Sequence, residues 1–256
     1  YYACQALGRL GCESAVAALA ARLGDDAGQV RIAALDALAQ LRSDESFRLL
    51  QEAATAGDPD VRRAALVGLG LRQRPEAIPL LIESARSSEA ATRLVALSGL
   101  AKFSSPAALG ELAAAAASDD EQLRSAAVSF LAESEEPEAD RLLVELVSRV
   151  DARHPAHAAL SAGPRSRVTS VLAALRTADG KAASALASAL VRMQTPDADA
   201  ALFEALTLPN GVARKAAARA LAEIGGAEVV VALGHAAARD PDPEVRDICS
   251  ALLTRG

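Results

Sequence analysis

Histidine, cysteine and carboxylate side chains are the groups of this sequence that could do chemistry. The 256 residues include three His. His154 and His157 lie close to Asp151 and could place ligands near one another, but their spacing matches no metal-binding signature and a polar loop explains it. His235 stands alone in its segment, where a solvated side chain is expected. We therefore predict no metal ion and no cofactor.

Cysteines and catalytic motifs point away from enzymatic chemistry. The three Cys are an odd number without regular spacing, which favours reduced thiols over a disulfide framework. Cys4 and Cys249 occupy apolar positions of the repeat and are interpreted as core residues, whereas Cys12 follows a glycine and is expected at the surface. The sequence has no Gly-rich phosphate loop, no Cys-x-x-Cys pair and no Gly-x-Ser-x-Gly elbow. We predict a protein that is not an enzyme.

Composition limits the classes of partner. The net charge is −6 and only 2% of the residues are aromatic, so the chain lacks the positive field and the stacking groups that nucleic acids require. No apolar stretch approaches the roughly 20 residues of a membrane span. Reduced thiols predict a cytoplasmic protein. Only three of the 27 basic residues are Lys, a bias typical of a GC-rich bacterial genome.

An internal repeat organises the chain. The segments QVRIAALDAL, DVRRAALVGL, ATRLVALSGL and QLRSAAVSFL align without gaps, and their arginines recur at equal intervals. A period of about 31 residues accommodates two helices of about four turns each and two short turns. Ala, Leu and Val must build the interior, which suits closely packed helices. The sequence predicts an all-α protein, a right-handed α-solenoid of about eight helical hairpins that forms a single domain over residues 1–256.

Apolar positions recur on one face of each predicted helix. The first helix of a hairpin carries three such columns at a 3.6-residue period, and the second helix adds a column of Leu. Gly68 and Gly99 interrupt first helices, where glycine costs about 1 kcal/mol, so we expect close backbone approach between layers there. The predicted core columns are Ala34, Ala65, Ala96 and Ala127; Leu35, Leu66, Leu97 and Val128; Leu38, Leu69, Leu100 and Leu131; and Leu50, Leu81, Leu112, Leu143 and Leu202.

Polar residues precede the first helices. Residues such as Asp58, Glu89 and Asn210 stand four positions before an Arg, where an N-cap is expected, and Pro59 follows one of them at the first helical position. The acids are also (i, i+4) partners of the arginines. We interpret this set as structural, holding loop to helix and repeat to repeat. Its members are Arg31, Arg62, Arg93, Arg124, Arg214, Arg246, Asp58, Asp120 and Asp242.

Residues 58–65 and 75–81 carry a specific motif. The first stretch reads Asp-Pro-Asp-Val-Arg-Arg-Ala-Ala and the second Pro-Glu-Ala-Ile-Pro-Leu-Leu. They resemble the short bacterial HEAT repeats first recognised in phycobilisome lyase subunits, and the resemblance extends over nearly the whole chain. It implies that second helices line the concave side of the solenoid. Similar repeats occur in scaffolds, adaptors, lyase chaperones and modifying enzymes, so the resemblance predicts the fold and leaves the function open.

The register breaks once, at about 151–177. The stretch from Arg124 to Ala183, which aligns with the next clear first helix, is slightly shorter than two repeats. We expect a shortened first helix in 151–163 and a second helix near 164–177, with altered local curvature and an exposed loop. Both ends of the chain fall inside a repeat, so we expect further chain or a partner to cover them.

Acidic residues recur along one face of the second helices. Two columns seven residues apart lie on the same helix face and would form a double stripe. An acid in the first turn also stabilises the helix dipole, which explains one column without any partner, and nearby arginines would neutralise part of the stripe. The residues predicted to bind a partner are Glu45, Glu76, Glu138, Asp197 and Glu228 in one column, and Glu52, Glu83, Glu145, Glu204 and His235 in the other.

These features favour a binding function. We predict a non-catalytic scaffold or adaptor that receives a protein partner, with a basic or helical segment, on the concave second-helix surface. One alternative, which the resemblance implies, is a lyase-type or chaperone subunit that handles a bilin or another prosthetic group and needs a reactive His or Cys near its groove. Another is a spacer segment of a larger multidomain protein.

Overall fold

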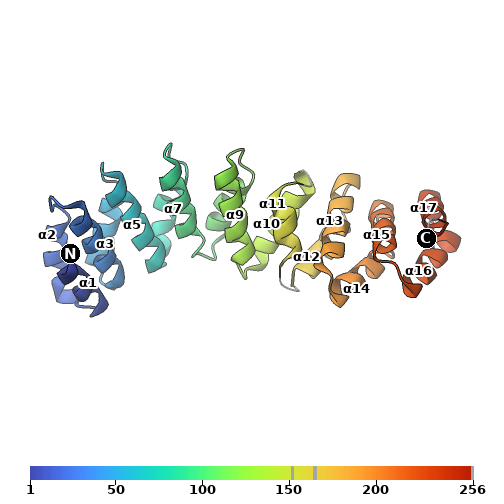
Figure 1. Ribbon diagram of the computed structural model, residues 1–256, viewed down its shortest axis with the longest axis horizontal. Helices are drawn as coiled ribbons and strands as arrows, with labels where there is room; N and C mark the ends of the chain where they lie inside the picture. Colours follow the sequence, from blue (N-terminus) through green and yellow to red (C-terminus); the bar gives the residue numbers. More distant parts are fainter. Residues whose placement is uncertain (151–152, 164–165, 255–256) are drawn as a thin grey trace. The chain divides into compact units, whose positions relative to one another are not determined.

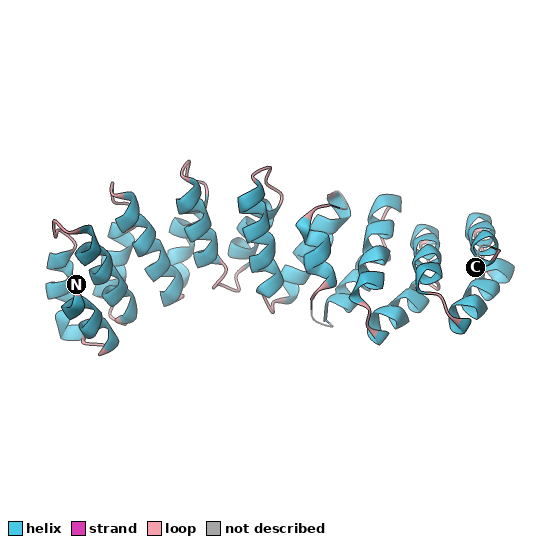
Figure 2. Ribbon diagram, in the orientation of Figure 1, coloured by secondary structure: helices cyan, strands magenta, loops and turns pink. Residues whose placement is uncertain are grey.

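The computed structural model describes residues 1–150, 153–163 and 166–254. Throughout these residues the chain consists of helices joined by turns, without a strand (Figure 2). The predicted all-α fold is confirmed. Predictions that fall on Asp151 and Pro164 lie outside the described residues. No helix in the described part of the chain is both long and apolar enough to cross a membrane.

The chain divides into two compact units, residues 1–130 and 131–256. In the first unit, first and second helices of successive hairpins alternate along the chain (Figure 1). The first helices are α1 (Tyr2–Arg9), α3 (Gly28–Gln40), α5 (Pro59–Arg72) and α7 (Ala90–Leu100). The second helices are η1 (Glu13–Ala15) with α2 (Val16–Arg22), α4 (Asp44–Ala53), η2 (Pro75–Ala77) with α6 (Ile78–Ala85), and α8 (Pro106–Ala116).

The helix α9 (Glu121–Glu133) spans the boundary between the units, and the second unit continues the alternation. Its helices are α10 (Pro137–Arg149), α11 (Pro155–Ser161), α12 (Ser166–Leu175), α13 (Gly180–Met193), α14 (Pro196–Ala205), α15 (Gly211–Ile224), α16 (Ala227–Arg239) and α17 (Pro243–Leu253). Within the described residues, eight successive helix pairs therefore precede α17, in agreement with the predicted α-solenoid. A single domain over residues 1–256 stays a prediction.

Side-chain caps explain where most first helices begin. Asp58 Oδ1 accepts hydrogen bonds from the backbone N–H groups of Asp60 at 2.9 Å and Val61 at 3.4 Å. Glu89 occupies the N-cap position of α7 as expected, but its side chain does not bond the backbone of the helix and instead accepts a hydrogen bond from the Thr92 hydroxyl at 2.6 Å. Other caps with a side-chain bond are Ser43, Ser105, Asp120, His154, Asp179, Thr195, Asn210 and Asp242.

The predicted apolar columns form the core. Leu66 and Leu69 on α5, like Leu50 and Leu81 on the second helices, are fully buried. Every other member of the four columns is at most 3% exposed. Each buried Leu contributes about 1.5–3 kcal/mol relative to an exposed one, so these columns make a large contribution to the stability of the first unit.

Glycines on first helices lie against neighbouring elements. A Cβ at Gly68 would stand 2.9 Å from Cδ2 of Leu50, and one at Gly99 would stand 2.9 Å from Cδ2 of Leu81. Both positions therefore make room for a leucine side chain of a second helix. The backbone approach occurs at Gly70, where a Cβ would stand 2.7 Å from Cα of Gly99. Close packing of α5 on α7 thus depends on a pair of glycines, Gly70 and Gly99.

The two layers of the first unit are packed differently. Successive first helices α1, α3, α5 and α7 lie side by side in close contact, whereas α2, α4, α6 and α8 pack chiefly on first helices and touch one another little (Figure 1). The two layers of this unit thus differ in how closely their helices approach one another. The expectation that second helices line a concave side stays a prediction.

The irregular repeat centres on α11, which has seven residues, fewer than any other first helix in the described residues. Arg167 on α12 is 1% exposed and reaches across this region. It donates hydrogen bonds to Asp140 Oδ1 at 2.6 Å and to the carbonyl oxygens of Ala159 and Ala132, both at 2.7 Å. One buried guanidinium thereby joins α9, α10, α11 and α12.

Candidate partner-binding surfaces

The arginine column forms a ladder between repeats. Arg31 Nη1 donates to the carbonyl oxygens of Asp25 and Asp26 in the preceding turn, and its Nη2 lies 2.6 Å from Asp58 Oδ2 in the next repeat. Arg62 contacts Glu89 at 3.2 Å in the same way. The remaining rungs are Arg93 with Asp120 at 2.9 Å, and the turn contacts of Arg124 to Ser118 and Asp119 and of Arg246 to Asp240 and Pro241.

This geometry corrects the predicted (i, i+4) pairs. Each acid of the ladder binds the arginine of the preceding repeat and not the arginine four residues later on its own helix. In the second unit Arg214 takes Asp240 as its partner, with two contacts of 2.9 Å, while Asp242 caps α17. The ion pairs of Arg31, Arg62, Arg93 and Arg214 thus hold repeat to repeat, whereas Arg124 and Arg246 bind the turn before their own helix.

Electrostatics of the ladder follow from these contacts. The Arg31 guanidinium, together with two backbone N–H groups, holds the pKa of Asp58 below its ordinary value. At Asp240 burial raises the pKa, but hydrogen bonds from Arg214 and from a backbone N–H outweigh it and leave the pKa lowered. Both carboxylates therefore stay ionised in the folded protein at neutral pH.

The predicted acidic stripe is largely neutralised in the first unit. On α4, Arg48 lies between Glu45 and Glu52 and pairs with both. Glu76 lies 3.1 Å from Arg74. Glu83 is exposed and takes no part in the ion pairs found among the described residues, because the adjacent Arg86 binds Glu111. These arginines offset part of the negative charge of the acids, and exposed pairs of this kind stabilise the fold little.

The second unit shows the same pattern. Arg141 on α10 lies between Glu138 at 2.6 Å and Glu145 at 3.7 Å, and Arg149 adds a contact to Glu145 at 2.6 Å. Glu204 lies 3.3 Å from Arg176, and together with Asp197 it lines a groove of about 500 Å³ between α12 and α14. Glu228 and His235 are exposed on α16. Charge of both signs, rather than an acidic stripe, characterises these helices.

Most of the histidine and cysteine side chains considered for chemistry are buried or bonded to the backbone. His154 Nδ1 accepts the backbone N–H of Ala156 at the start of α11, and His157 is buried. Cys4 and Cys249 are buried, as predicted, while Cys12 is partly exposed beside Ser14. In the described ranges no three His, Cys, Asp or Glu side chains are grouped as metal ligands.

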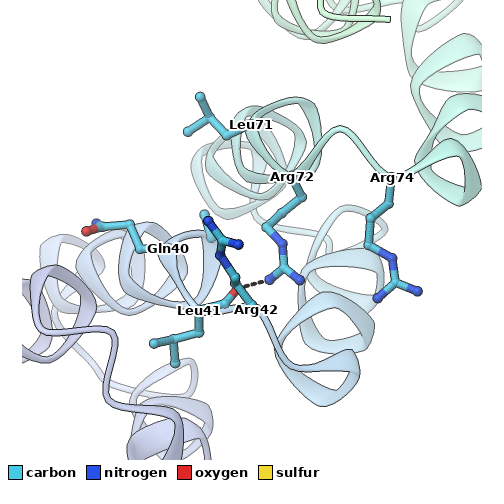
Figure 3. Close-up of a pocket in the computed structure, with 7 residues that line it drawn as sticks. Gln40, Leu41, Arg42, Leu71, Arg72 and Arg74 are labelled. Atoms are coloured by element: carbon cyan, nitrogen blue, oxygen red, sulfur yellow. Dashed lines mark hydrogen bonds between the residues drawn. The ribbon is translucent and has the colours of Figure 1, made fainter.

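A basic groove that sequence reasoning missed lies between the C-terminal ends of α3 and α5. Its volume is about 480 Å³, and Arg42, Arg72 and Arg74 line it together with Gln40 and Leu71. Figure 3 shows Arg72 reaching to the carbonyl of Leu41, while Leu71 points away from the arginines. The signal in the sequence was the run Leu71–Arg74, whose basic residues follow the end of an apolar helix and were not related to Arg42 one repeat earlier.

An apolar groove adjoins the basic one. It lies between α5 and α7, has a volume of about 140 Å³, and is lined by Val67, Leu71, Val95 and Lys102 with the Gly70 and Gly99 backbone. Leu71 is 64% exposed and Val67 is 44% exposed, one helical turn apart. Leu71 lines both grooves, so apolar and basic surfaces are continuous on the closely packed first-helix layer.

Comparison with protein families supports the repeat assignment. A family model described as HEAT repeats matches residues 1–70, 48–129, 78–162 and 168–253. These matches together cover most of the chain. No curated protein sequence matches it.

Solved structures match the chain at low sequence identity. A homology model of the full-length AP-3 complex has a TM-score of 0.51 and 16% identity, and the match covers 98% of this chain and 53% of that chain. Importin beta matches with a TM-score of 0.46 and 15% identity, and the match covers 96% of this chain and 41% of that chain. Human deoxyhypusine hydroxylase in complex with glycerol matches with a TM-score of 0.42 and 22% identity, and the match covers 97% of this chain and 98% of that chain. At such identities the likeness concerns the helical fold and not the activity.

Proposed function

This chain belongs to the HEAT-repeat family, and from that premise we propose that it is a non-catalytic scaffold or adaptor that binds a protein partner. Repeats of this kind contact mainly their neighbours and present extended surfaces of helices. The finer assignment to the short lyase-type repeats remains our proposal, supported by the motif of residues 58–65 and 75–81.

One observation carries the proposal of partner binding. Leu71 and Val67 are exposed side by side on α5, although the other large apolar side chains of that helix are buried. Contiguous exposed apolar surface next to polar groups is typical of protein-binding sites. The first-helix layer of the first unit is therefore the primary binding surface that we propose.

The second-helix acids are a secondary part of the proposal. Because Arg48 and Arg141 pair with four of them and Arg74 and Arg176 with two more, they would attract a basic or helical segment weakly and contribute to specificity more than to affinity. Glu83 retains the charge that such a segment could bind. Binding on this face should consequently show a small salt dependence.

Affinity capture followed by reconstitution tests this function. The tagged protein is used to capture partners from the cells that produce it, and each captured protein is then purified and titrated against it by calorimetry. We expect a complex of defined stoichiometry whose affinity falls in Leu71→Gln and changes little in the triple variant Glu52→Gln, Glu83→Gln, Glu145→Gln. Val231→Gln, at an apolar residue 73% exposed on α16, is the matched control.

The outcomes separate clearly. If no captured protein binds in the purified system, the scaffold proposal is wrong. If a partner binds but loses affinity chiefly in the triple Glu variant, the partner surface lies on the second helices and the choice of the first-helix layer is wrong.

A further inference from the structure

We propose that the surface formed by Arg42, Arg72, Leu71 and Lys102 binds an acidic segment of a protein, with an apolar side chain on Leu71 and carboxylates on the flanking cations. This inference rests on the proposed scaffold function and specifies the chemistry of the partner. All of the residues lie in the first unit.

The cations at this surface are available to an external anion. None of the ion pairs found among the described residues involves Arg42, Arg72 or Lys102, although the chain as a whole has an excess of acids. The nearest carboxylates bind other groups of the protein. Glu13 accepts the backbone N–H groups of Arg42 and Ser43 at 2.5 and 3.3 Å.

The remaining acids beside this surface bind Arg74. Asp44 lies 2.6 Å from its Nη1, and Glu76 lies 3.1 Å from its Nη2. Arg74 is therefore paired with acids, whereas Arg72 donates only to uncharged oxygens, which are the Leu41 and Ser43 carbonyls and the Ser46 hydroxyl. A carboxylate entering the groove would meet donors without displacing an internal acid.

Arg72 is held in place before any partner binds. Besides its three hydrogen bonds, its guanidinium carbon lies 5.9 Å from the centre of the Phe47 ring, and that of Arg74 lies 4.3 Å from the same ring. Burial and the positive charge of Arg74 lower the pKa of Arg72, so a bound carboxylate would relieve an existing cost. The Arg72 side chain therefore loses little conformational entropy when a partner binds.

The repeat sets the order of the contacts. Gln40, Leu71 and Lys102 are each separated by one full repeat and thus hold equivalent positions in three successive repeats. The Gln73 side chain donates to the Lys102 carbonyl at 3.1 Å, which ties the end of α5 to the turn after α7. A segment that crosses these helices meets Arg42 and Arg72, then Leu71, then Lys102. Its sequence should therefore place an apolar residue between acidic ones.

This chemistry favours a protein segment over a polyanion. Exposed apolar area separates the cations, and a phosphate backbone gains nothing from Leu71 or Val67. A nucleic acid would instead need a continuous basic track, and the net charge of −6 opposes its approach. The donors of a guanidinium match the two oxygens of a carboxylate as well as they match a phosphate.

Fluorescence anisotropy with a defined probe tests the proposal. The probe is the fluorescein-labelled peptide GEELFEEG, compared with GQQLFQQG, which lacks the charges, and GEESSEEG, which lacks the apolar centre. It is titrated with the wild-type protein and with Arg42→Gln, Lys102→Gln and Leu71→Gln. Arg239→Gln and Val231→Gln, at exposed positions of α16, are matched controls for charge and apolar area. Thermal unfolding checks that every variant remains folded.

We expect GEELFEEG to bind more tightly than either control peptide, and each groove variant to weaken it roughly fivefold or more, because each removes one charge-assisted or apolar contact. Added salt should weaken binding further. The α16 variants should bind as the wild type does. Failure of GEELFEEG to bind, equal binding by groove and control variants, or tighter binding of an oligothymidylate of similar length would overturn the proposal.

The groove and the scaffold function can fail separately. A partner obtained by capture is titrated against the combined variant Arg42→Gln, Leu71→Gln, Lys102→Gln. Unchanged affinity there overturns the acidic-segment proposal while the scaffold function stands. Loss of affinity supports both.

Discussion

Arg31 Nη2 lies 2.6 Å from Asp58 Oδ2, although the two are 27 residues apart in sequence. The arginine leaves the first turn of α3 and meets the acid that caps α5, so the contact joins two repeats and a helix start at once. Arg62 with Glu89 and Arg93 with Asp120 repeat this relationship at the same separation of 27 residues.

The ladder should make stability depend on pH in acid. Hydrogen bonding to Arg31 lowers the pKa of Asp58 in the folded state, so its contribution is complete above the unfolded pKa of about 4 and disappears as the pH falls through the lower folded value. Asp58→Asn should reduce Tm at pH 7 and flatten the decline of Tm below pH 4. Calorimetry at several pH values measures this.

Asp60→Asn is the control for this experiment. Asp60 is more exposed and binds Arg63 on its own helix. If it alters the pH profile as much as Asp58→Asn does, the contact between repeats is not the source of the acid sensitivity.

The glycine contact predicts opposite effects of one substitution at two positions. Gly70→Ala places a methyl group against the backbone of Gly99 and should destabilise the protein by roughly 1–3 kcal/mol. Gly110→Ala, inside α8 with no atom within 4 Å of the new Cβ, should stabilise it by about 0.5–1 kcal/mol through helix propensity. Urea denaturation distinguishes the two, and equal effects would contradict the close approach of α5 and α7.

Removing one partner of the buried pair Asp140 and Arg167 should be costly. Their side chains are 6% and 1% exposed, and Arg167→Met leaves the carboxylate uncompensated at a cost of about 3–5 kcal/mol. The double variant Asp140→Leu, Arg167→Met removes both charges and should recover part of that loss. Denaturant midpoints of the single and double variants provide the measurement. If the double variant loses more unfolding free energy than the two single variants lose together, the ion pair does not compensate its buried charges.

Thiol reactivity should differ among the three cysteines. Cys12 is partly exposed and should react with iodoacetamide in the native protein. Cys249 is buried, and burial raises the pKa of its thiol, so it should react only after unfolding, as should buried Cys4. Mass spectrometry of labelled peptides with and without denaturant checks this order. Native labelling of Cys249 at the rate of Cys12 would show that α17 opens readily.

Local and periodic features of the fold could be predicted from the sequence. Columns such as Leu38, Leu69 and Leu100 are buried because each repeat returns them to the same helix face, and capping residues such as Asp58 indicate a helix start. Contacts that depend on how helices cross could not be predicted. No local periodicity relates Arg31 to Asp58, and the acid four residues before each arginine was the partner that helix geometry suggested in its place.

The candidate site was less predictable, for the same reason. The acidic columns and their partial neutralisation by nearby arginines are visible as a pattern, but only the side-chain positions show that Arg48 and Arg141 each lie between two of the acids. The groove of Arg42 and Arg72 arises where two helix ends from successive repeats converge, and no single segment contains it. Arg167 was likewise missed, because its carbonyl and carboxylate partners belong to three other helices.

The ladder also bears on how such a chain could change in length during evolution. Each rung from Arg31 to Arg93 joins the same kind of donor to the same kind of acceptor in the following repeat. Deleting one whole repeat would bring Arg31 to the place of Arg62, opposite Glu89. Duplicating a repeat would insert an ion pair that matches those on both sides of it. Recombination between repeats would therefore preserve the interfaces, and lineages could gain or lose hairpins without inventing new contacts.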